Sequence, residues 1–269
     1  MKPCVERPVS IRGREFGGPK PLFCIPLVAS EPVGLVAQAE IARELQADLV
    51  EWRADFSKDW TPEGLVCAGN ILREILPDEP IIFTLRVKAE GGAQDMPQAQ
   101  RGASIEAVLR SNSFDIVDLE VDSEPEFLAP LMRLAQEQGV RVVLAHHDFE
   151  GTPQNELLFA KIAAVHEKGA DIAKLAVMPK VPGDTLRLLH VTSEARGLFP
   201  RLLLSTMSMG ALGSITRVAG FLYGSDIAYC VGREISAPGQ IPIKDARLMT
   251  GMLLRMHGER DESVLSSLF

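Results

Sequence analysis

The sequence predicts a single (β/α)8 barrel that spans residues 1–269. Eight short runs rich in apolar and β-branched residues alternate with helical segments at a spacing of roughly 30 residues, as in repeated βα units. The length of 269 residues also suits such a barrel. An open doubly wound sheet is the alternative, but no glycine-rich phosphate loop follows the first predicted strand.

The predicted strands come in order along the chain, at residues 22–30, 48–55, 81–87, 115–122, 141–149, 171–179, 201–209 and 225–232. Helical patterns fill the segments between them. Gly139 and Gly169 stand where a helix would end before the next strand. "TPEG" and "TPQNE" place proline and acidic residues where a helix would begin. Residues 1–21 precede the first strand, and we expect "VSIRGREFGGP" to form a small hairpin that closes the bottom of the barrel.

Composition excludes several classes of protein. A hydrophobic fraction of 46% and a charged fraction of 24% are typical of a soluble globular chain. A formal net charge of −8 disfavours nucleic acid as a partner, and no apolar stretch reaches the length of a membrane span. No signal peptide is evident, so we expect a cytoplasmic protein. The cysteines form no C-x-x-C pair, which argues for free thiols and against a disulfide framework or a zinc site. They are Cys4, Cys24, Cys67 and Cys230.

Polar residues interrupt the predicted strands at alternating positions. Parallel strands buried on both faces usually read as apolar runs. Here Glu51 and Arg53, then Arg86, His147 and Lys174, fall late in four different strands. Because the active site of a barrel lies at the carboxyl ends of its strands, these residues predict a polar pocket at the barrel mouth. For each residue taken singly, a buried ion pair is the alternative.

Lys174 lies in the apolar run "DIAKLAVMP", and alternation places it inward with Ile172 and Ala176. Burial among apolar side chains disfavours an ammonium, and a neutral amine attacks carbonyls to form Schiff bases. We therefore expect a nucleophilic lysine kept dry by its neighbours. The alternative is a structural lysine paired with a carboxylate of the barrel interior. The candidate partners are Glu51, Asp118 and Glu120.

His147 ends the fifth predicted strand with the inward parity, beside the strand of Lys174. Imidazole is the usual proton shuttle near neutral pH, so His147 is the candidate general base. Glu90 would orient it if the loop after the third strand folds over the barrel mouth. Asp148 should face away, and His146 should point outward as a packing residue.

Arginines and a proline- and glycine-containing loop are candidates for anion binding. The planar guanidinium groups of Arg53, Arg86 and Arg217 suit anionic oxygens. Arg217 follows "MSMGALGSIT", a turn into a helix after the seventh strand, where barrels often bind anions. The loop "ISAPGQIP" at residues 235–242 offers Ser236 and Gln240 as hydrogen-bond donors. Met207 and Met209 are expected in the pocket wall or the core.

Taken together, these segments resemble the type I 3-dehydroquinate dehydratase family. "EWRAD", "FTLRVKAEGG", "DIVDLEVD", "VVLAHHDFEGTP", "GADIAKLAVMP", "STMSMGALGSITRVAGFLYGSDIAY" and "GREISAPGQIP" occur in the family's order over nearly the whole chain. The resemblance implies that Lys174 attacks the C3 ketone of 3-dehydroquinate to form an imine. His147 would then remove the C2 proton and give it to the departing C1 hydroxyl, while Glu90 orients His147. The net reaction is a syn-dehydration to 3-dehydroshikimate that uses no metal and no organic cofactor.

The resemblance also implies a cytoplasmic homodimer with a set of substrate-binding residues. Arg217, Ser236 and Gln240 would bind the carboxylate and nearby oxygens. Glu51, Arg53 and Arg86 would recognise ring hydroxyls, and Ser30 at the end of the first strand is a further substrate-binding candidate.

Two residues of the histidine segment depart from the family pattern. Ala145 replaces a Ser or Cys, and His146 replaces an aromatic residue. A class I aldolase acting on phosphorylated sugars, and a catalytically silent barrel that binds a cyclic acid, are the alternative functions.

Overall fold

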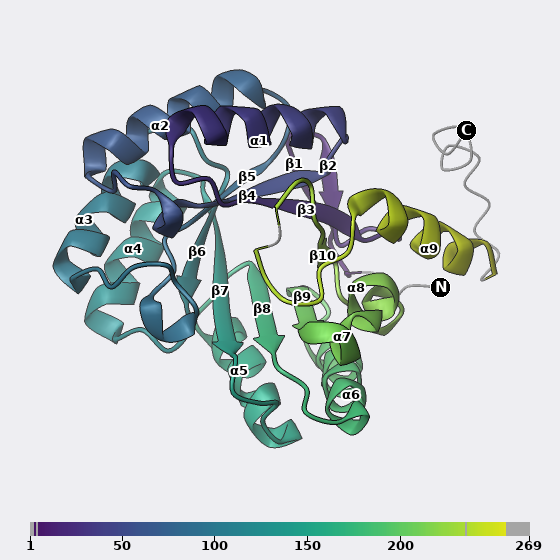
Figure 1. Ribbon diagram of the computed structural model, residues 1–269. Helices are drawn as coiled ribbons and strands as arrows, with labels where there is room; N and C mark the ends of the chain where they lie inside the picture. Colours follow the sequence, from purple (N-terminus) through teal and green to yellow (C-terminus); the bar gives the residue numbers. More distant parts are fainter. Residues whose placement is uncertain (1–2, 4, 235, 257–269) are drawn as a thin grey trace.

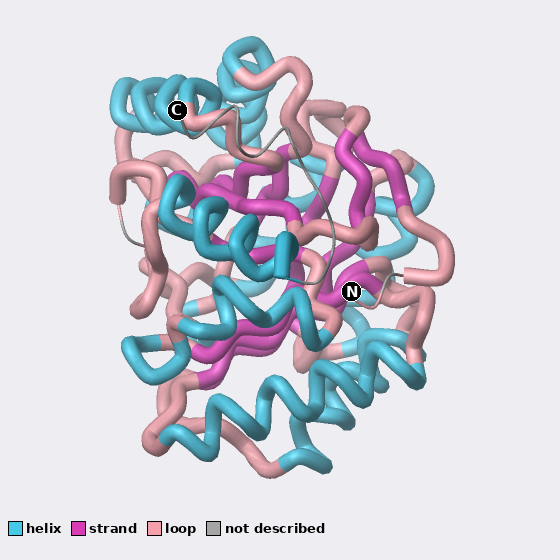
Figure 2. The backbone as a smooth tube through the Cα atoms, turned by 90° about the vertical axis from the view of Figure 1, so that its right-hand side faces the viewer, coloured by secondary structure: helices cyan, strands magenta, loops and turns pink. Residues whose placement is uncertain are grey.

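The computed structural model describes residue 3, residues 5–234 and residues 236–256. Eight parallel strands follow one another in the order β10-β3-β4-β5-β6-β7-β8-β9, and helices surround them (Figures 1 and 2). β9 and β10 meet through Asp226, whose N–H donates to Leu204 O (2.6 Å) and whose Oδ2 accepts from Leu204 N (2.8 Å). The predicted (β/α)8 barrel is therefore confirmed.

The elements have the following bounds. They are β1 (Val9–Ile11), β2 (Arg14–Phe16), β3 (Leu22–Leu27), α1 (Pro32–Glu44), β4 (Leu49–Arg53), η1 (Ala54–Phe56), α2 (Pro62–Ile75), β5 (Ile81–Thr84), η2 (Lys88–Glu90), α3 (Gln98–Leu109), β6 (Ile116–Glu120), α4 (Pro125–Glu137), β7 (Arg141–Asp148), α5 (Asn155–Glu167), β8 (Ile172–Val177), α6 (Pro182–Leu198), β9 (Leu203–Ser208), α7 (Gly210–Gly213), α8 (Ile215–Ala219), η3 (Gly220–Tyr223), β10 (Ile227–Tyr229) and α9 (Ile243–Met256).

All eight predicted strands exist, and each is shorter than the sequence suggested; β5 and β10 show why. β5 ends at Thr84 instead of reaching residue 87, because the N–H of Val87 donates to the Glu120 carboxylate (3.2 Å) and not to a neighbouring strand. β10 ends at Tyr229, since Val231 N donates to Ile241 O (2.8 Å) in the following loop. In both cases the chain leaves the sheet early to build the barrel mouth.

Local signals explain where the helices begin and end. Gly139 (φ 70°) and Gly169 (φ 76°) follow α4 and α5 in the left-handed conformation that glycine adopts without strain, as predicted. At the start of α2, the Thr61 side chain accepts a hydrogen bond from Gly64 N (3.1 Å), and Pro62 occupies the first turn.

A hairpin of β1 and β2 closes the bottom of the barrel, as the sequence predicted. Arg12 (φ 46°) and Gly13 (φ 75°) form its tight turn with positive φ at both positions, the geometry that suits a two-residue hairpin. Phe16 is fully buried in one cluster with inward residues of the strands, among them Leu49 and Ile82. The hairpin thus plugs the amino ends of the strands and leaves the opposite end for a site.

Other expectations concern the cysteines and the membrane. Cys24, Cys67 and Cys230 are free thiols, whereas Cys4 and residues 257–269 lie outside the described residues. In the part of the chain that is described, no helix has both the length and the apolar character needed to cross a membrane.

Candidate active site

Strand register brings Lys174 and His147 to one face. β7 and β8 pair Ala145 with Lys174 and His147 with Ala176, so the lysine and the histidine both point inward. They line a cavity of about 120 Å³ at the carboxyl ends of the strands. Its wall consists of Glu51, Arg53, Glu90, Gly91, His147, Phe149, Lys174, Ala176, Met207, Met209, Arg217, Tyr229, Ser236, Ala237 and Gln240. A larger cavity of about 220 Å³ lies beside the hairpin at the other end and is lined by no lysine.

Lys174 is buried and also ion-paired. Its Nζ donates to Glu51 Oε1 (2.7 Å) and Asp118 Oδ2 (2.8 Å) and lies 4.5 Å from the centre of the Tyr229 ring. Only 4% of the residue is exposed. The expectation of a dry lysine holds, but its surroundings are not purely apolar, since two of the three candidate carboxylates contact it. Proton removal therefore has to precede any nucleophilic attack.

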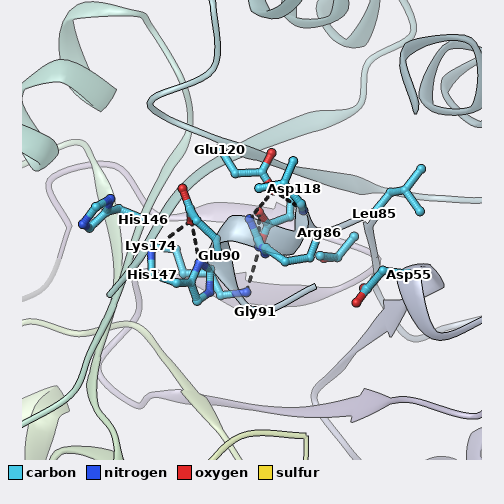
Figure 3. Close-up of polar contacts among 12 residues, drawn as sticks. Asp55, Leu85, Arg86, Glu90, Gly91, Asp118, Glu120, His146, His147 and Lys174 are labelled. Carbon is cyan, nitrogen blue, oxygen red and sulfur yellow. Dashed lines mark hydrogen bonds and ion pairs between the residues drawn. The ribbon is translucent and has the colours of Figure 1, made fainter. Parts of the chain in front are cut away.

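Asp118, one of the two carboxylates that contact Lys174, belongs to a wider charge network with Arg86 and Glu120 (Figure 3). Arg86 Nη2 donates to Asp118 (2.6 Å) and Arg86 Nη1 donates to Glu120 (2.9 Å). Burial disfavours ionised Asp118, yet Arg86 and Lys174 outweigh it and hold the pKa of Asp118 below its usual value. Asp118 thus remains a carboxylate that fixes the position of Lys174.

His147 is held by Glu90 through two contacts. Glu90 Oε2 accepts the backbone N–H of His147 (2.9 Å) and lies 3.0 Å from its Nδ1, as Figure 3 shows. Burial raises the pKa of Glu90 to about 7. Burial also lowers the pKa of His147 well below its usual value, and the nearby Arg86, Lys174 and Arg53 lower it further. His147 is therefore a neutral base at neutral pH, with Nε2 left for a substrate.

The residues on either side of His147 face away from the cavity. Asp148 accepts from Glu150 N (2.8 Å) and Gly151 N (2.9 Å) in the following turn, as expected. His146 also points away from the cavity, but it is not merely a packing residue. Its Nδ1 lies 3.0 Å from Asp122 Oδ2, a polar contact that the sequence did not predict.

Arg217 is the buried cation in this wall that has no carboxylate partner among the described residues. Nη1 donates to Tyr229 O (3.2 Å), Nη2 donates to Pro238 O (3.1 Å), and Nε has no hydrogen-bond partner in the described part of the chain. Burial lowers the pKa of Arg217 to about 10, so it is charged at neutral pH. A buried cation of this kind is suited to an anionic group on a ligand.

The loop after β10 closes over Arg217. Gly239 has φ 78°, and a Cβ atom at this position would lie 2.3 Å from Gly210 O, so only glycine allows this approach. Ser236 and Gln240 join their side chains, with Gln240 Nε2 donating to Ser236 Oγ (3.0 Å). Ile235, which belongs to the same predicted loop, lies outside the described residues.

Most of the predicted site residues meet at this cavity, but two do not line it. Arg86 lies behind it, with its guanidinium on Asp118 and Glu120. Ser30 is exposed in the loop before α1. Arg53 does line the cavity and forms a bidentate pair with Asp55 (both 2.8 Å).

Sequence reasoning did not single out four wall residues, of which two have large side chains, Tyr229 and Phe149; the others are Gly91 and Ala237. Strand alternation would have placed Tyr229 inward, but nothing local indicated its contact with Lys174.

One group of described residues has the composition of a metal site. Glu90, Asp122 and His146 offer atoms within 4.8 Å of one another. These groups already have partners within the protein. His147 contacts Glu90, and both His146 and Lys161 contact Asp122. We assign no metal to this group.

Comparison with known proteins gives consistent matches. The profile of the family described as type I 3-dehydroquinase matches residues 23–255. A 3-dehydroquinate dehydratase of Geobacillus kaustophilus (strain HTA426) is 43% identical over 248 residues, which cover 91% of this chain and 95% of that protein. The enzyme of the same name from Bacillus subtilis (strain 168) is 35% identical over 246 residues, covering 91% and 96%.

Solved structures agree with these relatives. The crystal structure of the Geobacillus kaustophilus enzyme superposes with a TM-score of 0.91 at 40% identity, covering 96% of this chain and all (100%) of that one. A type I 3-dehydroquinate dehydratase from Clostridium difficile, solved with covalently modified comenic acid, has a TM-score of 0.90 at 27% identity and covers 94% and 100%.

Proposed function

The chain belongs to the type I 3-dehydroquinase family, and on that basis we propose that it dehydrates 3-dehydroquinate to 3-dehydroshikimate through a Schiff base on Lys174. The enzyme is a hydro-lyase of the shikimate pathway. The observation that supports the covalent route is that a buried lysine and a neutral imidazole line one cavity with Arg217, a cation without a carboxylate partner among the described residues. These are a nucleophile, a base and an anion receptor.

The first step joins Lys174 to the substrate. After Nζ gives up a proton, its lone pair attacks the C3 carbonyl carbon, and the resulting carbinolamine loses water to form a protonated imine. His147 is the neutral base that shares the cavity with the amine. Glu51 and Asp118 hold the nitrogen in place before attack and stabilise the positive iminium after it.

The second step moves one proton and expels one water. The iminium withdraws electrons from C2, so His147 Nε2 can take the C2 proton and leave an enamine. The C1–O bond then breaks as the imidazolium gives the same proton to the departing hydroxyl. Glu90 on Nδ1 stabilises the imidazolium between these transfers. Hydrolysis of the imine releases 3-dehydroshikimate and restores the lysine, which balances the loss of one water overall.

Substrate recognition follows from the charges of the wall. Arg217 binds the carboxylate, because within the described residues its Nε lacks a partner and no carboxylate neutralises it. Ser236 and Gln240 lie at the same end of the cavity and bind nearby oxygens. Glu51 and Arg53 bind the ring hydroxyls. Arg86 acts indirectly, through its hydrogen bond to Asp118.

Borohydride trapping tests the covalent step. Incubation with 3-dehydroquinate and borohydride, followed by peptide mass spectrometry, should yield a reduced adduct on Lys174. Lys174→Ala should yield neither adduct nor product, while Lys180→Ala, which removes an exposed lysine after the same strand, should retain both. Turnover without a Lys174 adduct would refute the Schiff-base mechanism.

We also propose that the enzyme is a cytoplasmic homodimer. Free thiols at Cys24, Cys67 and Cys230 suit a reducing compartment. Ile215 of α8 and Met249 of α9 are about half exposed (52% and 47%) on adjacent helices and provide an apolar surface for a second copy. Sedimentation equilibrium of the purified chain distinguishes a dimer from a monomer.

A further inference from the structure

A second group of charged side chains lies beside Glu90, outside the cavity. Asp122 follows β6, accepts a hydrogen bond from Lys161 Nζ of α5 (2.5 Å) and contacts His146 Nδ1 of β7 (3.0 Å). We call Asp122, His146 and Lys161 the outer cluster. Atoms of Glu90, Asp122 and His146 lie within 4.8 Å of one another, so the outer cluster is close enough to act on Glu90.

The outer cluster adds Asp122 to the charges near Glu90, where Glu120 and Asp118 raise the pKa of Glu90 and Arg86 lowers it. Burial disfavours ionised Asp122, but Lys161 and His146 outweigh it and keep the pKa of Asp122 below its usual value. Asp122 is therefore already ionised in the pH range where Glu90, with a pKa of about 7, loses its proton. An unneutralised Asp122 would oppose that loss, because like charges a few ångströms apart repel.

His146 lies close to both Asp122 and Glu90. The charged and titratable groups that face it are Asp122 from the turn after β6, Glu90 from η2, and His147 from its own strand, with Lys161 reaching it through Asp122. Figure 3 shows the two neighbouring imidazoles on different sides of the Glu90 carboxylate, His147 in contact with it and His146 apart.

We propose that the outer cluster sets the pH at which the Glu90–His147 pair becomes active, because His146 and Lys161 neutralise Asp122 and so limit its repulsion of Glu90. Asp122, His146 and Lys161 are positioning residues, since none lines the cavity. The inference rests on the proposed function, in which Glu90 and His147 act together in proton transfer. Removing His146 or Lys161 should therefore raise the pH at which the Glu90–His147 pair loses its proton.

The expected size follows from the geometry. Two unit charges no more than 4.8 Å apart shift each other's titration by roughly half a pH unit or more, even when fully screened by water. Full screening is the appropriate limit because Asp122 is 47% exposed. Shifts of about half a pH unit or more are therefore expected, and kcat/KM profiles resolve them.

The experiment measures kcat/KM for 3-dehydroquinate against pH, which reports titrations of the free enzyme. His146→Phe and Lys161→Met should each move the acidic limb to higher pH and leave the plateau little changed. The double variant His146→Phe/Asp122→Asn should move the limb back toward that of the parent, because the uncompensated carboxylate is gone. His190→Phe, which removes an exposed histidine of α6, is the matched control and should not move the limb.

A uniform loss of rate at every pH in His146→Phe, or a double variant whose limb stays displaced, would overturn the proposal. NMR titration of the His147 imidazole in the parent and in His146→Phe measures the same displacement without turnover. An absence of dehydration in every protein would refute the proposed function, while this titration would still decide on the outer cluster.

Discussion

Replacing Arg217 with methionine should make the protein slightly more stable and much weaker at binding its substrate. The pKa of Arg217 is lowered to about 10 by burial, against 12.5 for the unfolded chain. Below pH 10 the buried charge of Arg217 therefore lowers the free energy of unfolding by about 3 kcal/mol. Its two hydrogen bonds to Tyr229 O and Pro238 O offset about 1 kcal/mol each. Arg217→Met should thus raise the free energy of unfolding by about 1 kcal/mol.

Differential scanning calorimetry at neutral pH tests the predicted change in stability of Arg217→Met. For a chain of this length, about 1 kcal/mol corresponds to a rise in Tm of about 2 °C. Steady-state kinetics tests binding, because losing the partner of a buried carboxylate costs about 3 kcal/mol, or a KM about 100-fold higher.

Arg53→Met is the matched control from the same cavity wall. Burial disfavours the charge of Arg53, but the bidentate contact with Asp55 outweighs it and raises the pKa of Arg53. This variant leaves a buried carboxylate unpaired, so its Tm should fall. If Arg217→Met lost several degrees in Tm and kept its KM, both the unpaired-cation argument and the role in carboxylate binding would be wrong.

Two further predictions concern Glu90 and the barrel bottom. Glu90 has a pKa of about 7 when folded against 4.5 when unfolded, so its ionisation destabilises the fold as pH rises through this interval. Glu90→Gln should flatten the dependence of Tm on pH between these values and lower kcat by about 10- to 100-fold; a dependence as steep as that of the parent would contradict the assignment. Phe16 is fully buried in the plug, and Phe16→Ala should cost about 3–5 kcal/mol in chemical denaturation while KM stays unchanged; a raised KM would show that the two ends of the barrel are coupled.

Strand periodicity predicted the inward set because it needs only local information. A period of two places Lys174 and His147 on the same face once β7 and β8 are neighbours, and the register confirms it. The partner of Lys174 could not be chosen in this way. Glu51, Asp118 and Glu120 all share the inward parity, and the sequence does not show that Lys174 pairs with Glu51 and Asp118.

The sequence could not predict contacts made by helices and loops either, because local patterns do not show which distant residues meet in the fold. Glu120 is not left for Lys174 because Arg101 of α3 binds it together with Arg86, and no sequence pattern links a helix position to a strand carboxylate. The contact of Glu90 with His147 depends on how the chain turns after β5 ends at Thr84. The sequence could therefore predict which way a side chain on a strand points, but not which residue it pairs with.

The balance of charge at the barrel mouth explains why a monocarboxylate suits this site. Four cations and four carboxylates pair with one another, and they are Lys174, Arg53, Arg86 and Arg101 with Glu51, Asp55, Asp118 and Glu120. Glu90 is engaged with His147, which leaves Arg217 as the cation of the described wall without a carboxylate partner. One carboxylate on the ligand supplies the partner that Arg217 lacks, as in 3-dehydroquinate. A phosphorylated sugar brings a charge of about −1.5 to −2 at pH 7 and leaves part of it uncompensated in a buried site. The same lysine chemistry in this wall thus favours a dehydratase over an aldolase of sugar phosphates.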